Sequence, residues 1–471
     1  MTVRGTEELL EEKNMDLKGK KVLVFGAGKS GIGAAGLLLR KQAEVILYDG
    51  NAKQDPEKLK EKLPEDSSPE MILGEFPEQR IGELDLTVLS PGVPADLPEM
   101  QKIKEKGIPV WGEVELAYQV GNGQVLAITG TNGKTTTTSL LGEIMKNCRE
   151  DVQVVGNIGT AYTSVALDTT EKTVTVAEVS SFQLETIETF HPRASAITNI
   201  TEDHLNRHHT MDEYIRVKER ITENQTMDDV CVLNYEDEIL RAFGEKLIRE
   251  QKVRVFFFSS QRELEEGIYY RDGEIYLSRD GKKELVVRTD DLKILGLHNF
   301  ENVMTAVAMA YDVGVSLETI RQAVCAFRGV EHRIEYVCEK NGVAYYNDSK
   351  GTNPDAAIKG IQAMNRPTLL IGGGFDKQST YESWIRSFDG KVRYLVLIGE
   401  TKEKIAETAR REGFQDILMA ENLEQAVKLC AEKANPGDAV LLSPACASWD
   451  QFDSYEQRGE KFKEYVRALK E

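Results

Sequence analysis

The sequence lacks the features of a secreted protein. Its cysteines are scattered along the 471 residues without a Cys-x-x-Cys pair, which is typical of reduced, intracellular chains. The first residues, MTVRGTEELLEEKNMD, contain no apolar core, so this segment does not resemble a signal peptide. We therefore expect a cytoplasmic protein. The cysteines are Cys148, Cys231, Cys325, Cys338, Cys430 and Cys446.

The sequence also lacks an excess of basic residues and a long apolar run. Its 59 Lys and Arg residues stand against 78 Asp and Glu residues, which gives a net charge of −19. Binding to nucleic acid needs clustered Lys and Arg against the phosphates, so we expect no nucleic-acid partner. A helix that spans a bilayer needs about 18 or more consecutive apolar residues, and none is present, so we expect no stable membrane insertion.

What the sequence does contain is three successive α/β patterns. At about 150 residues per domain, the length predicts roughly three domains. Short apolar runs alternate with helical patterns in each region, which predicts mostly parallel sheets. We place the boundaries at 1–115, 116–329 and 330–471, and we expect Rossmann-like sheets in the first and third domains and an ATP-binding sheet in the second. The apolar runs include VLVFGAG, EVILYD, QVLAITG, VTVAEVS, LLIGGG and AVLLSPA.

One glycine-rich turn predicts a site for a nucleoside triphosphate. The stretch AITGTNGKTTTTSLL (127–141) combines a strand, a turn with glycine, a lysine and a hydroxyl run that opens a helix. Free N–H groups at a helix N-terminus bind phosphate, the lysine reaches the outer phosphates, and the first hydroxyl binds Mg²⁺. Ile128 stands where the strict P-loop pattern has its first glycine. The predicted ATP contacts here are Gly130, Thr131, Asn132, Gly133, Lys134, Thr135 and Thr136.

A second glycine-rich turn lies about a hundred residues earlier, in KVLVFGAGKSGIGAAGLLL (21–39). The spacing Gly26-x-Gly28-x-x-Gly31, with Asp49 ending the next strand, alone predicts NAD or FAD, with the carboxylate on the ribose. A tight turn without a ligand is the alternative. A nicotinamide would leave the ATP loop without a role. Two phosphate-binding turns are better explained by ATP together with a substrate that carries a nucleotide.

Several polar residues at strand ends could take part in chemistry. Glu178 ends a hydrophobic strand and is a candidate Mg²⁺ ligand, although strand-end carboxylates are often only solvated. His204, after Asp203, is the best histidine for metal or substrate contact, whereas we expect His208 and His209 at the surface. From spacing alone, Lys218 in EYIRVKERITEN is a solvated helix lysine.

Polar groups further along the chain have two interpretations. Asn299 and Asn302 lie three apart at a helix start and share one face, so they either recognise a nucleotide or cap the helix. The turn in SPACASWDQFDSYEQRG (443–459) either binds an anion or amino acid or is a packing turn. Arg333, Asp348, Lys350 and Thr352 are expected around strand ends.

The order of these motifs resembles the Mur ligase family from about Gly19 to the C-terminus. SSFQLE, NDSKGTN and SPACASWDQF favour the members that add D-glutamate to UDP-N-acetylmuramoyl-L-alanine. The resemblance implies three domains, for the uridine nucleotide, ATP and the amino acid, and a monomer. It implies ligation through an acyl phosphate in cytoplasmic peptidoglycan precursor synthesis. The motifs are GTNGKTT, NIG, EVSSFQLE, ITEDHLNRH, HNFEN, EHRIE, NDSKGTN and SPACASWDQF.

The resemblance also implies roles for single residues. Thr135 and Glu178 would bind one Mg²⁺, and His204 and a carbamylated Lys218 would hold a second. Lys134, Glu178, His204, Lys218 and Lys350 would form the catalytic set. Further ATP contacts would be Asn299, Asn302, Arg333 and Asp348. Contacts to the two substrates would be Lys29, Ser30, Gly31, Asp49, Ser90, Pro91, Gly92, Asn157, Ser180, Thr352, Lys377, Ser448 and Tyr455.

Three rival interpretations stay open at this point. One is an NAD-dependent oxidoreductase with an accessory nucleotide site. Another is a nucleotide-dependent switch without catalysis. The third is a different ligase of the same family, adding L-alanine, a diamino acid or a glutamate to folate.

Overall fold

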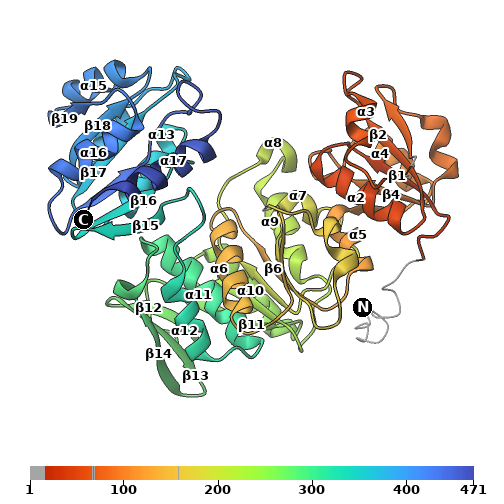
Figure 1. Cartoon of the computed structure of the whole chain (residues 1–471). Coiled ribbons are helices and arrows are strands. Elements are labelled where there is room, and N and C mark those ends of the chain that lie inside the picture. The colour runs from red at the N-terminus through yellow and green to blue at the C-terminus, as the bar shows by residue number, and fades with distance from the viewer. Residues whose placement is uncertain (1–15, 66, 68, 158, 471) are drawn as a thin grey trace. The chain divides into compact units, whose positions relative to one another are not determined.

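The computed structural model describes residues 16–65, 67, 69–157 and 159–470, whose strands form three sheets (Figure 1). The expectation of no signal peptide falls on the N-terminal segment, which lies outside the described residues except for Asp16. The chain divides into two compact units: one runs to Val286 and includes Glu301–Arg321, and the other holds Val287–Phe300 and the chain from Gln322.

The first sheet has five strands in the order β3-β2-β1-β4-β5, and its strand pairs are parallel. In β1 and β4 nearly every side chain is buried, as expected for strands that helices cover on both faces. The strands are β1 (Lys21–Phe25), β2 (Glu44–Asp49), β3 (Glu70–Leu73), β4 (Leu86–Leu89) and β5 (Val110–Gly112). The helices are α2 (Lys29–Arg40), α3 (Pro56–Lys60), α4 (Pro98–Glu105) and α5 (Glu113–Val120).

The second sheet has nine strands in the order β14-β13-β12-β11-β10-β9-β6-β8-β7. From β7 to β12 the pairs are parallel, and β12 pairs with β13 antiparallel. The strands are β6 (Gln124–Thr129), β7 (Val152–Gly156), β8 (Val174–Glu178), β9 (Ala194–Ile197), β10 (Val230–Asn234), β11 (Arg254–Ser259), β12 (Gly267–Arg271), β13 (Glu274–Arg279) and β14 (Lys282–Arg288).

The helices of this region differ in length, and α7 and α8 are the shortest of those named here. They are α6 (Lys134–Lys146), α7 (Ser181–Leu184), α8 (Leu205–His208), α9 (Met211–Glu219), α10 (Glu238–Glu250), α11 (Leu297–Asp312) and α12 (Leu317–Ala326). Because β6 lies between β8 and β9, the loops that follow these three strands meet at one edge of the sheet. That edge is where open α/β sheets bind ligands.

The third sheet has six strands in the order β15-β16-β20-β17-β18-β19, with only the β15–β16 pair antiparallel. The strands are β15 (Glu335–Lys340), β16 (Val343–Asn347), β17 (Thr368–Gly373), β18 (Val392–Ile398), β19 (Ile417–Met419) and β20 (Ala439–Leu442). The helices are α13 (Pro354–Ala363), α14 (Glu382–Arg386), α15 (Lys402–Arg411), α16 (Leu423–Lys433) and α17 (Tyr455–Ala468).

The predicted fold class is confirmed: three α/β regions, each with a mostly parallel sheet. The antiparallel β12–β13 pair and its neighbour β14 were not foreseen. The boundaries at residues 115 and 329 stay predictions. Within the described residues, no helix is both long and apolar enough to cross a membrane.

Candidate functional site

The first glycine-rich turn closes tightly against the strand that precedes it. A Cβ atom on Gly31 would lie 1.8 Å from the carbonyl oxygen of Gly26, so no larger residue fits without moving the backbone. The Asp49 carboxylate accepts a hydrogen bond from the Ala27 amide at 2.8 Å. The sequence motif therefore forms the compact βα turn that phosphate binding requires.

A cavity of about 470 Å³ opens beside this turn. Its walls come from the first sheet and from the loops after β7 and β8, all within one compact unit. Seven predicted substrate contacts line it: Lys29, Ser30, Asp49, Ser90, Pro91, Gly92 and Asn157. Gln183, which sequence reasoning did not single out, lines it too, although SSFQLE was among the quoted motifs.

The second turn, 130–136, brings its lysine back over the loop. Lys134 Nζ donates to the carbonyl oxygens of Gly130 and Thr131, each at 2.9 Å. Gly133 has φ +83°, and a Cβ there would lie 2.2 Å from Asn302 Oδ1. The helix α11 thus packs its Asn302 directly against the turn, and the role of that amide at a nucleotide stays a prediction.

Glu178 has one carboxylate oxygen to spare. The side chain is 2% exposed at the end of β8, and its Oε1 accepts a hydrogen bond from Asn157 Nδ2 at 3.0 Å. Its Oε2 is buried without a hydrogen-bond partner in the part of the chain that the structure describes. A buried, unsatisfied carboxylate oxygen is costly and suits a bound cation.

Lys218 is buried, and the solvated position that spacing alone predicted is wrong. Its side chain is 1% exposed, and Nζ donates to the Gly130 carbonyl oxygen at 2.8 Å. Burial, together with the nearby charge of Lys134, lowers the pKa of the Lys218 amine to about 7. The helix α9 was expected to expose this lysine to solvent, but its side chain packs against the loop of residues 130–136. The amine is therefore partly neutral at physiological pH.

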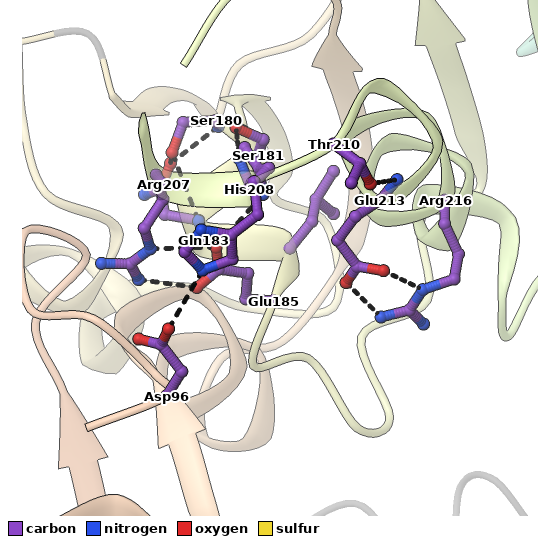
Figure 2. A network of polar contacts seen from close by, with 12 residues as sticks. Asp96, Ser180, Ser181, Gln183, Glu185, Arg207, His208, Thr210, Glu213 and Arg216 are labelled. Carbon is purple, nitrogen blue, oxygen red and sulfur yellow. Dashed lines mark hydrogen bonds and ion pairs between the residues drawn. The ribbon is translucent and has the colours of Figure 1, made fainter. Parts of the chain in front are cut away.

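The histidines divide differently from what the sequence suggested. His204 has φ +53° and precedes α8, with its side chain half-exposed and Nε2 3.5 Å from Asp203 Oδ2. His209 is exposed, as expected, but the prediction that His208 lies at the surface is wrong. His208 is 3% exposed and its Nε2 lies 2.9 Å from Ser181 Oγ (Figure 2). Burial lowers its pKa.

The other compact unit holds a second group of predicted residues. Asp348 is buried and accepts a hydrogen bond from Ser443 Oγ at 2.7 Å, and burial raises the pKa of this carboxyl to about 7. Lys350 Nζ lies 5.3 Å from the centre of the Tyr455 ring, and Lys377 Nζ lies 5.1 Å from the ring of the exposed Trp449. The turn of 443–459 therefore carries both aromatic partners of these lysines.

One residue that sequence reasoning missed connects these loops. Arg458 is 1% exposed, and its guanidinium donates to Ser349 Oγ and the Ser349 carbonyl oxygen, as well as to the carbonyl oxygens of Cys446 and Ala447. It thus ties the loop before Lys350 to the loop before Ser448. Its place within the amphipathic helix α17 gave no signal of burial.

The remaining predicted residues lie near these groups. Thr135 and Thr136 open α6, and Ser180 caps α7 by accepting from the Gln183 amide. Asn299 is buried and donates to the Leu295 carbonyl oxygen at 2.7 Å. Arg333 is exposed, Thr352 is half-buried and Ser448 is buried. Their proposed contacts with substrates stay predictions.

Two glycine-rich strand–helix turns within three mostly parallel sheets are typical of nucleotide-binding α/β proteins. Comparison with known families identifies the branch: this chain belongs to the Mur ligase family. The family models matched are the MurD-like N-terminal domain at residues 20–112, the Mur ligase middle domain at 128–310 and the glutamate ligase domain at 332–446.

Relatives and solved structures agree with this membership. The chain is 55% identical to the UDP-N-acetylmuramoylalanine–D-glutamate ligase of Lachnoclostridium phytofermentans and 54% identical to that of Lachnospira eligens, each over 97% of this chain and 100% of the relative. A MurF structure from Acinetobacter baumannii matches with TM-score 0.58 and 15% identity over 95% of this chain and 93% of its own. The UDP-N-acetylmuramate-alanine ligase MurC of Thermotoga maritima gives TM-score 0.56 and 18% identity over 96% of this chain and 100% of its own. These two structures support the fold alone.

Proposed function

We propose that this protein is an ATP-dependent ligase that joins D-glutamate to UDP-N-acetylmuramoyl-L-alanine in peptidoglycan precursor synthesis. The full-length identity to ligases of that name supports it. The observation that carries it is the position of Asn157. This side chain lines the 470 Å³ cavity beside the first turn and donates to Glu178 next to the ATP loop. A substrate in the cavity would thus end close to the triphosphate.

The reaction would proceed in two steps. A carboxylate oxygen of the alanyl group attacks the γ-phosphorus of ATP, the bond to the bridging oxygen breaks, and ADP leaves. The amine of D-glutamate then attacks the acyl carbon, phosphate leaves with the C–O electron pair, and the nitrogen loses a proton. Lys134 would neutralise charge on the phosphates during the first step.

The residues present fit Mg²⁺. Glu178 Oε2 is buried and has no hydrogen-bond partner among the described residues, and carboxylate and hydroxyl oxygens are the ligands that Mg²⁺ prefers. We assign Thr135 and Glu178 to one ion, and His204 and a carbamylated Lys218 to a second. When bound, Mg²⁺ would offset the repulsion between the attacking carboxylate and the triphosphate.

We further propose that Lys218 becomes carbamylated. Its pKa of about 7 leaves a neutral amine, whose nitrogen can attack CO₂ and then release a proton. The product is a carbamate anion beside the loop. In the C-terminal region, Lys350, Thr352, Lys377, Ser448 and Tyr455 would hold D-glutamate, and Asn299, Asn302, Arg333 and Asp348 would contact ATP.

The deciding experiment is an amino-acid panel assayed with ATP, Mg²⁺ and UDP-N-acetylmuramoyl-L-alanine. We expect phosphate release and a new product mass with D-glutamate. Release with L-alanine or a diamino acid in its place would assign the chain to another member of the family. A change in reduced-nicotinamide absorbance would support the oxidoreductase, and phosphate release without either substrate would support the switch.

Two further proposals concern the state of the protein. The scattered cysteines, which form no Cys-x-x-Cys pair in the sequence, support a reducing compartment, and we propose the cytoplasm. We also propose a monomer, which sedimentation at assay concentration would test.

A further inference from the structure

A polar network lies between the short helices α7 and α8 (Figure 2). At its centre lies Arg207, which follows His204 by three residues. Arg207 Nε donates to Glu185 Oε1 at 3.1 Å, and Arg207 Nη2 donates to Glu185 Oε2 at 2.6 Å. The two side chains are only 11% and 13% exposed. A two-pronged, largely buried pair of this kind fixes the orientation of the guanidinium.

The same guanidinium reaches a third segment. Arg207 Nη2 also donates to the carbonyl oxygen of Val93 at 2.9 Å. Val93 directly follows Ser90-Pro91-Gly92, and all four residues line the cavity of the first turn. One side chain therefore joins the segment after β9, the helix after β8 and the loop after β4.

Arg207 is also coupled to His204 through an aromatic ring. The guanidinium carbon lies 5.1 Å from the centre of the Phe182 ring, a cation–π distance. The Phe182 ring in turn lies 4.9 Å from the imidazole of His204. Because His204 is half-exposed, this ring contact is a means of restricting where its imidazole can point.

Other contacts hold Glu185 in place to receive Arg207. Arg220 donates to the carbonyl oxygens of Leu184 and Glu185, at 2.8 and 2.7 Å, and so satisfies the end of α7. At the start of the same helix, His208 Nε2 meets Ser181 Oγ at 2.9 Å. The helix is anchored at both ends, so the carboxylate is presented in one position.

We propose that Arg207 is a positioning residue of this enzyme. Held by Glu185, it fixes the positions of the loop at Val93 and of the His204 imidazole relative to each other. The alanyl carboxylate of the substrate and the metal-binding imidazole are thereby brought together. This proposal rests on the proposed function, and it assigns Arg207 no contact with a reacting atom.

The test is Arg207→Met, which keeps much of the apolar length and removes the guanidinium. A misplaced loop and imidazole predict a KM for UDP-N-acetylmuramoyl-L-alanine raised roughly 10- to 100-fold. They also predict a higher half-saturating Mg²⁺ concentration. The KM for ATP should not change, because Arg207 bonds to Glu185 and Val93, whereas Lys134 bonds within its own loop to Gly130 and Thr131. General destabilisation would not produce this division among three ligands.

Conservative variants and a matched control sharpen the test. Arg207→Lys keeps the charge but cannot make the fork, so it should resemble Arg207→Met. Glu185→Gln keeps the side-chain volume. It should raise the KM for UDP-N-acetylmuramoyl-L-alanine and the half-saturating Mg²⁺ concentration, but by less than Arg207→Met does. Arg216→Met removes an arginine from an exposed pair with Glu213, whose side chains are 63% and 41% exposed, and should leave all constants unchanged.

The outcomes separate this proposal from the function on which it depends. If the wild-type protein makes no product with D-glutamate, the proposed function fails. If the wild type is active and Arg207→Met shows the constants of Arg216→Met, the positioning role is overturned. Circular dichroism verifies folding. Should Arg207→Met fail to fold, Glu185→Gln decides, because unchanged KM and Mg²⁺ dependence in that variant also overturn the proposal.

Discussion

The two glycine-rich turns of this chain share a local design but differ in the charged side chains that bond to their backbone. Each joins a buried strand to a helix N-terminus through glycines. In the first, an anion supports the loop: Asp49 accepts from the Ala27 amide. In the second, two cations converge, since Lys134 and Lys218 both donate to the carbonyl oxygen of Gly130.

We propose that this difference separates a turn that binds a phosphate from a turn at which a phosphoryl group is transferred. Helix N-terminal amides suffice to bind a diphosphate that stays intact. Transfer of a phosphoryl group develops charge that needs fixed cations nearby. Two ammonium groups at one carbonyl repel each other, which contributes to the lowered pKa of Lys218. An anionic ligand, or conversion of one amine to an anion, would relieve that repulsion.

The largest expected effect comes from the lysine of the second turn. Lys134→Ala removes a cation placed over the loop and should lower turnover on the order of 10²-fold or more. Binding of UDP-N-acetylmuramoyl-L-alanine, measured by titration calorimetry, should be unchanged. Lys146→Ala, at the exposed end of the same helix, is the control. Wild-type turnover in Lys134→Ala would remove the distinction between the two turns.

The next effect falls on the first turn alone. Gly31→Ala would place a Cβ 1.8 Å from the Gly26 carbonyl oxygen and force the turn open. We expect the KM for the uridine substrate to rise on the order of 10-fold or more and the KM for ATP to stay constant. Gly82→Ala, where nothing lies within 4 Å of the added atom, is the matched control. An equal rise in both constants would contradict separate roles.

A third effect concerns stability and pH. Burial and Lys134 lower the pKa of Lys218 from 10.5 to about 7, so between these values the unfolded chain binds more protons at this residue than the folded one. Its contribution therefore makes the free energy of unfolding increase as pH rises from about 7 toward 10.

Urea denaturation can isolate that contribution. In CO₂-depleted buffer, the wild-type protein should gain stability relative to Lys218→Met between pH 7 and pH 9. Below pH 7 both states of the wild type are protonated, so the difference between the two proteins should be constant there. A flat difference across the whole range would show that Lys218 is not held neutral.

Much of this comparison could be read from the sequence, because glycine spacing and hydrophobic runs are local. Both turns and the fold class followed from them. The burial of Lys218 and His208 could not be predicted from the sequence, because it depends on which distant loops pack against their helices. The burial and contacts of Arg458 and Arg207 were not predicted for the same reason, because each arginine bonds to a residue more than a hundred positions away in the sequence. The antiparallel strand β13 was not predicted, because no helix separates it from its neighbouring strands and the alternation of strands and helices was the signal used.

The smallest expected effect distinguishes two roles for Asp49. Its carboxylate lines the 470 Å³ cavity, yet both oxygens already accept backbone hydrogen bonds, from Ala27 at 2.8 Å and Asn51 at 2.9 Å. Asp49→Asn keeps one acceptor and loses the charge, which is worth about 1 kcal/mol. If the carboxylate mainly supports the loop, the KM for the uridine substrate should rise only severalfold.

A second carboxylate, which bonds to the backbone at the other end of β1, supplies the control for that result. Asp85 accepts from the Lys21 amide at 2.9 Å, at the opposite end of β1 from the cavity. Asp85→Asn should lower the melting temperature about as much as Asp49→Asn and leave the KM unchanged. A KM for Asp49→Asn as high as that of Gly31→Ala would instead place the carboxylate on the substrate itself, as the ribose contact predicted from the glycine motif requires. The first turn would then act on the substrate through the Asp49 carboxylate as well as through its backbone and Lys29.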